Sequence, residues 1–113
     1  MKYMLLIYTP EGSLDGLSEE ERRSVSAEYF AISDSPNVVD GAQLAAVDTA
    51  TTVRVPNGST LTTDGPFADT KEYLAGYYLV DANDLDTAIE IAARIPASRM
   101  GGAVEVRPLV VYP

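Results

Sequence analysis

The sequence predicts an α+β fold in which the elements follow the βαββαβ order of a ferredoxin-like sheet, with one added hairpin. Residues 17–33 and 83–96 have the apolar period of helices. The segments around them are rich in apolar, β-branched and aromatic residues, as strands are. The length of 113 residues and a hydrophobic content of 46% fit one domain over residues 1–113 with a modest core.

The N-terminal half begins with a strand and continues with a helix. Residues 2–9, KYMLLIYT, form a continuous apolar run, which predicts a central strand buried on both faces. Ser18 followed by Glu21 is the spacing of a capping box, and Pro36 ends the helix that starts there. The expected buried stripe of this helix is Val25, Tyr29 and Ile32.

The middle of the chain is predicted to be β-rich. Residues 37–45 are a weaker strand candidate, and residues 51–63 form two β-branched runs around Asn57-Gly58, as in a hairpin. Pro56 lacks a backbone donor, which favours a loop of four residues over two. Residues 72–80 follow as a strand in which Gly76 permits a bulge or a close backbone approach.

A second helix and a last strand complete the pattern. Asn83 or Asp84 caps the helix over residues 83–96, and Pro96 ends it. Residues 103–113 form a terminal strand interrupted at Pro108. The expected buried face of the helix is Leu85, Ala88, Ile89, Ala92 and Ile95.

The first strand also predicts an assembly, because both of its faces are apolar. Two helices can cover only one face of the sheet, and a large exposed apolar patch is uncommon in a monomer. A second copy packed sheet to sheet is therefore expected. One face carries Tyr3, Leu5 and Ile7, and the other carries Met4, Leu6 and Tyr8.

Composition excludes several classes of function. An excess of 17 acidic over 8 basic residues gives a net charge of −9, which opposes binding to nucleic acids and to anionic membranes. No apolar stretch has the length of a membrane span, and the N-terminus lacks the pattern of a signal peptide, so a cytoplasmic protein is expected. Without cysteine or histidine, and without a calcium-loop spacing, the chain is expected to hold no metal or cofactor.

The strand pattern breaks at Asp64-Gly65-Pro66-Phe67, which raises the question of whether this is a turn or a site. Asp64 beside Lys71 could act as a base or hold a ligand. As an Asx-turn residue, Asp64 would instead have a structural role, which we prefer, and Phe67 would pin the loop to the core.

Cations and tyrosines supply the other candidates for ligand binding. Arg99, in the glycine-rich connection after the second helix, could bind an anion or form a salt bridge at the helix end. Arg54 and Arg107 leave the same two alternatives open. The aromatic candidates for a pocket wall, which are as readily explained by the core or an interface, are Tyr8, Tyr77 and Tyr78.

Three stretches resemble the DGPF type of the YCII-related family, namely residues 1–8, 50–80 and 84–109. That group has DGPF followed by AETKE, and this chain differs only by Asp69 in place of the glutamate. The resemblance implies a dimeric α+β barrel. Some relatives are thought to use a histidine and an aspartate as isomerases, dehalogenating enzymes or hydrolases, but this chain has no histidine and has Ile95 at the aspartate position.

Two classes of function follow from the residues and the resemblance together. The preferred one is a homodimeric domain that binds a small molecule, with anions among the candidates, in a pocket beside residues 64–72. The occurrence of relatives next to sigma factors implies a regulatory or accessory role for it. The alternative is an isomerase-like or hydrolase-like enzyme with Asp64 as the base and Arg99 or Lys71 stabilising an anion.

Overall fold

The computed structural model describes residues 1–113, and a four-stranded antiparallel sheet forms its centre. The strand order is β2-β5-β1-β6, which places β1 between two neighbours as the apolar run predicted. Without the β3–β4 hairpin, this is the topology of a ferredoxin-like sheet, so the predicted α+β fold class is confirmed. The strands are β1 (Lys2–Pro10), β2 (Val38–Gln43), β5 (Glu72–Asp81) and β6 (Ala103–Pro108).

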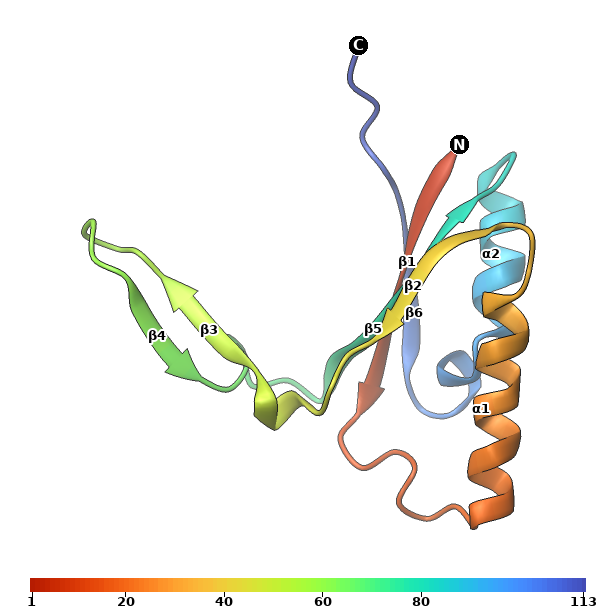
Figure 1. Cartoon of the computed structure of the whole chain (residues 1–113), viewed down its shortest axis with the longest axis horizontal. Coiled ribbons are helices and arrows are strands. Elements are labelled where there is room, and N and C mark those ends of the chain that lie inside the picture. Colours follow the sequence, from red (N-terminus) through yellow and green to blue (C-terminus); the bar gives the residue numbers. More distant parts are fainter.

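The two helices, α1 (Glu19–Ser33) and α2 (Leu85–Arg94), lie on the same face of this sheet (Figure 1). Two single-turn helices, η1 (Val47–Thr49) and η2 (Pro96–Arg99), are part of the connections. The hydrophobic core lies between the helices and the covered sheet face. Its most deeply buried side chains are Leu5, Val80, Ile91, Ile95 and Pro96. None of the helices has the length and apolar character needed to cross a membrane.

The predicted helix starts are confirmed by their hydrogen bonds. The backbone N–H of Glu21 donates to the Ser18 hydroxyl at 3.1 Å, and the Glu21 carboxylate accepts from the Ser18 N–H at 3.0 Å, which completes the capping box. Of the two caps considered for α2, Asp84 is the one used, and it accepts from the Thr87 N–H at 2.8 Å. Local sequence alone therefore defines both N-termini.

The buried face of α2 is rotated relative to the prediction. Ala88 and Ala92 are buried as expected, but Leu85 and Ile89 are 50% and 48% exposed. Ile91 is 2% exposed instead. Positions 88, 91, 92 and 95 share the spacing of the predicted set, so the period was right, and contact with the sheet selected the neighbouring stripe.

Gly76 on β5 has both of the roles considered for it. The pairing of β1 with β5 shifts register opposite this glycine, between Ile7 and Tyr8. A Cβ at position 76 would also lie 2.7 Å from the Ala42 carbonyl oxygen. Glycine therefore permits β2 to approach the bulged part of β5.

A separate hairpin of β3 (Thr51–Arg54) and β4 (Leu61–Asp64) projects from the body (Figure 1). The loop between these strands covers residues 55–60, which is longer than the two or four residues expected, with Gly58 at a φ of +79°. We call residues 51–64 the arm. Its projection contributes to a radius of gyration of 16.0 Å, against roughly 13 Å for a compact domain of this size.

The sheet face opposite the helices has no covering layer in this chain, and we call it the open face. Register and side-chain alternation place eight apolar residues there, five of which are half-buried. An Arg107–Glu105 ion pair on β6 borders the face along one edge. The eight residues are Met4, Leu6, Tyr8, Ala42, Leu74, Tyr77, Leu79 and Ala103.

The capping carboxylates predict a pH dependence of stability. The Ser18 N–H holds the pKa of Glu21 below its ordinary value of 4.5, and the Thr87 hydroxyl followed by the Thr87 N–H holds the pKa of Asp84 below 3.8. A depressed folded-state pKa stabilises the protein above the unfolded-state pKa, and this contribution is lost as pH falls through the folded-state value.

We therefore expect the melting temperature to fall as the pH is lowered from about 4.5 through the folded-state pKa values of these two carboxylates. It should fall less steeply in Asp84→Asn, whose amide oxygen can still accept from Thr87 but does not titrate over this range. Thermal melting followed by circular dichroism at several pH values measures both slopes. Identical slopes in the unmodified protein and in Asp84→Asn would show that the Asp84 carboxylate does not contribute to this pH dependence.

Candidate functional site

The DGPF sequence forms the root of the arm, where the chain returns to the body. Gly65 has a φ of +93°, its N–H donates to the Ala50 carbonyl at 2.7 Å, and its own carbonyl accepts the Thr52 hydroxyl at 2.8 Å. Asp64 is the exposed last residue of β4, and its carboxylate makes no hydrogen bond within the chain. The predicted turn therefore exists. It is formed by the left-handed conformation of Gly65 and by the hydrogen bonds of the Gly65 backbone, and the Asx-turn bond expected from Asp64 does not form.

The loop that follows is exposed. Phe67 is 78% exposed, so the expectation that it pins the loop to the core of its own chain is wrong. The reason is that the arm carries this loop away from the covered face. Lys71 is also exposed and forms no ion pair with Asp64.

Hydrogen bonds connect the end of this loop to β5. The Tyr73 hydroxyl donates to the Asp69 carboxylate at 2.8 Å, and this bond raises the pKa of Tyr73. The Thr70 hydroxyl donates to the Glu72 carbonyl at 2.6 Å. Tyr73 thus connects the loop after the DGPF sequence to a neighbouring hollow, which Tyr73 itself lines.

That hollow, the strand-end hollow, has a volume of about 350 Å³ and lies where β1 ends and β5 begins. Glu11, Asp15 and Asp48 line it together with a single cation, Arg22, so its charged side chains are mainly acidic. Such walls disfavour an anionic ligand. The full lining consists of residues 9–15, Arg22, residues 44–48 and residues 73–75.

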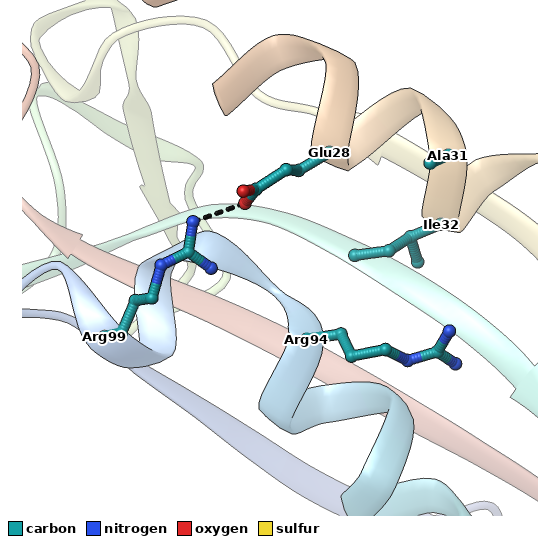
Figure 2. Close-up of a pocket in the computed structure, with 5 residues that line it drawn as sticks. All are labelled: Glu28, Ala31, Ile32, Arg94 and Arg99. Atoms are coloured by element: carbon teal, nitrogen blue, oxygen red, sulfur yellow. Dashed lines mark hydrogen bonds and ion pairs between the residues drawn. The ribbon is translucent and has the colours of Figure 1, made fainter. Parts of the chain in front are cut away.

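A second hollow, the helix cleft, lies between α1 and the end of α2, and its volume is also about 350 Å³ (Figure 2). Its lining residues are Glu28, Ala31, Ile32, Arg94 and Arg99. Pro96 ends α2 and begins η2, which places one arginine on each side of this bend. The cleft therefore combines two cations, one anion and an apolar floor.

The two arginines of the cleft differ in their partners. Arg99 forms an ion pair with Glu28, and these side chains are 52% and 41% exposed. A pair this exposed contributes little to stability. Arg94 has no hydrogen bond or ion pair within the chain, so its guanidinium is free to bind a ligand.

Tyr29 connects this cleft to the sheet. The Tyr78 hydroxyl on β5 donates to the Tyr29 carbonyl at 2.8 Å, and the Ser33 hydroxyl donates to the same carbonyl at 3.1 Å. Burial raises the pKa of the half-buried Tyr29 phenol, which remains protonated at neutral pH. These bonds fix the last turns of α1, and with them Ile32.

The predicted site residues do not gather in one place within this chain. Asp64, Phe67 and Lys71 lie at the arm root, whereas Arg99 lies against α1. Tyr8 and Tyr77 are half-buried on the open face, and Tyr78 is buried under the helices. Arg54 is exposed on the arm, and Arg107 pairs with Glu105.

Sequence reasoning missed Arg94 and Glu28. The signal for Arg94 was its position, five residues before Arg99 and on the other side of Pro96. Glu28 was part of the expected helix but gave no sign of its role, because its contact with Arg99 spans 71 positions.

The fold thus defines a small α+β domain with a ferredoxin-like sheet. The YCII-related domain family matches residues 1–112, and the chain belongs to this family. A Rhizobium meliloti (strain 1021) protein, itself described as uncharacterised, is 36% identical over 117 residues. That match covers 99% of this chain and 94% of the relative.

A solved structure with a similar fold is 5-chloro-2-hydroxyhydroquinone dehydrochlorinase (TftG) from Burkholderia phenoliruptrix AC1100, in complex with 2,5-dihydroxybenzoquinone. The TM-score is 0.57, and the match covers 97% of this chain and 94% of the other. With 15% sequence identity, this similarity concerns the fold alone.

The bonding at the arm root predicts different effects of two neighbouring substitutions. Asp64→Ala should change the free energy of unfolding by no more than about 0.5 kcal/mol, because no bond is lost. Gly65→Ala should cost about 1–2 kcal/mol, because a Cβ is strained at a φ of +93°. Urea unfolding measures both changes. A larger loss in Asp64→Ala than in Gly65→Ala would contradict the observed turn.

Proposed function

We propose that this chain is a homodimeric binding domain whose ligand is a small organic anion held in the helix cleft. The observation that carries the binding proposal is the pair of arginines around this hollow. Arg94 and Arg99 flank it in a chain whose net charge is −9, and Arg94 has no internal partner. Two cations that line one hollow attract an anion against this background charge.

The lining of the cleft favours a small ligand with an apolar body and an acidic group. A guanidinium matches the two oxygens of a carboxylate or a related delocalised anion. Ala31 and Ile32 offer apolar contact, and a volume of about 350 Å³ lies at the small end of the range for ligand sites. The 2,5-dihydroxybenzoquinone held by the dehydrochlorinase of similar fold belongs to this chemical class.

Binding is favoured over catalysis by the residues that the cleft lacks. The chain has no histidine or cysteine, and Asp64, the base of the enzyme hypothesis, lies at the arm root and not in the cleft. The strand-end hollow is connected to residues 64–72 through the Tyr73–Asp69 bond, although none of these residues lines it, and it suits a neutral or cationic molecule better. A domain that binds a metabolite without converting it fits a regulatory or accessory role.

The homodimer is supported by the open face. Helices cover one side of the sheet, while Leu6, Tyr77 and Leu79 lie on the other without a covering layer. Exposing such a face to water is unfavourable at roughly 25 cal/mol per Å². A second copy with the same face covers both surfaces at once, through a two-fold axis.

The anion proposal predicts opposite effects of substitutions around the cleft. Arg94→Gln should weaken binding of 2,5-dihydroxybenzoquinone at least about tenfold, because a charged hydrogen bond is lost. Glu28→Gln should strengthen it severalfold, because Arg99 is released from its ion pair. Isothermal titration calorimetry measures both affinities.

Arg23→Gln is the matched control, since Arg23 is an exposed arginine on α1 outside the cleft. It should bind like the unmodified protein. Equal weakening in Arg23→Gln and Arg94→Gln would reduce the effect to nonspecific attraction and overturn the assignment to the cleft.

The homodimer proposal predicts a particle of about twice the 12.1 kDa chain mass. Light scattering coupled to size exclusion at micromolar concentration measures this mass. Leu6→Glu should yield the monomer, because it places a charge on the open face, whereas Glu20→Gln on the helix layer should leave the dimer unchanged. A monomeric unmodified protein would overturn the proposal.

A further inference from the structure

The arm exposes apolar side chains that nothing in this chain covers. Val53, Val55 and Leu61 are 59%, 57% and 53% exposed. The strands β3 and β4 pair only with each other, and an isolated two-stranded hairpin is at best marginally stable in water. A surface that packs against the arm would bury these apolar side chains and stabilise the hairpin.

The direction of the arm shows which surface can reach it. The arm extends from the body on the side of the sheet opposite the helices (Figure 1). This is the side of the open face, which the homodimer proposed above assigns to a second copy. A chain seated on that face therefore lies on the same side as the arm.

The charge of the arm is compatible with a second copy as the occupant. Two chains with a net charge of −9 repel each other, so they associate best through surfaces without net charge. The arm contains one cation, Arg54, and one anion, Asp64. Acidic residues are instead concentrated on α1 and at its start, including Glu19, Glu20, Glu21 and Glu28.

The area required for a stable dimer also supports a contact between the arm and a second copy. A standard interface buries roughly 800 Å² on each partner. Five of the eight apolar side chains of the open face are already half-buried within their own chain, so they contribute only part of this area. The arm adds apolar side chains that are more than half exposed.

We propose that the arm of each copy packs against the second copy of this chain and thereby clasps the homodimer. This inference rests on the proposed homodimer and adds a contact beyond sheet-to-sheet packing. Two-fold symmetry makes each copy both donor and acceptor of an arm. The arm root, with Asp64 and Phe67, then lies beside the partner and serves the assembly.

The sharpest test compares two lysine substitutions on the arm. Leu61 and Thr60 are neighbouring exposed residues, so neither substitution disturbs the core of the chain itself. Leu61→Lys should raise the dimer dissociation constant at least about 100-fold, because each dimer loses two buried apolar contacts and gains two charges. Thr60→Lys should change it less than about threefold. Analytical ultracentrifugation measures both constants.

Excision of the arm is the second test. The Gly65 nitrogen and the Ala50 carbonyl oxygen are 2.7 Å apart, so a two-glycine link can replace residues 51–64 without moving the body. The shortened chain should keep its far-ultraviolet circular dichroism apart from the lost strands. Its dimer should be at least as weak as that of Leu61→Lys.

Cross-linking identifies the chain that the arm contacts. The protein has no cysteine, so Val53→Cys labelled with a benzophenone maleimide carries a single photoreactive group. It should cross-link two copies, whereas the same label on Arg23→Cys, on the helix layer, should not. Mass spectrometry of a mixture of isotopically light and heavy chains distinguishes contacts between copies from contacts within one.

Each outcome decides a different point. The clasp is overturned if the dimer keeps its affinity in Leu61→Lys and after excision, or if the Val53 cross-links form only within one chain. Neither result contradicts the homodimer. A monomeric unmodified protein overturns the homodimer and the clasp together. Cross-links between copies with weakened variant dimers support both.

Discussion

A sheet that is apolar on both faces but covered by helices on only one is the constraint on which this molecule depends. Along β1, Leu5 is fully buried under the helices, whereas Leu6 lies on the open face. The helix layer closes one core and leaves a second apolar surface without a cover. The core forms on the covered face. The proposed dimer forms on the open face, and the arm projects on that same side (Figure 1).

The sequence predicted those parts of the fold that depend on neighbouring residues. The Ser18 capping box, the Asp84 cap and the strand periods are local patterns, and the structure contains each of them. The rotation of α2 was not predictable, because Ile89 and Ile91 fit a helix equally well and only the position of the sheet chooses between them. The arm was predicted as a hairpin, but nothing local indicates that it stays outside the main sheet.

The difference between local patterns and contacts of distant residues also explains which parts of the candidate site were predicted. Arg99 was singled out from its place after the second helix, and the salt bridge considered for it exists. Its partner Glu28 comes from a distant helix, so no spacing in the sequence connects the two. Phe67 was expected in the core because aromatic residues usually bury their rings, but its exposure follows from the course of the arm.

The proposed ligand site and the proposed dimer surface lie on opposite faces of the sheet. Each copy would therefore keep its cleft open to solvent after association, and the dimer would have two equivalent sites. Any coupling between binding and association must cross the sheet. The contact available for this is on β5, where Tyr77 lies on the open face and the next residue, Tyr78, donates to the Tyr29 carbonyl on α1. Tyr29 directly follows Glu28, so this path ends at the ion pair that a bound anion would disturb.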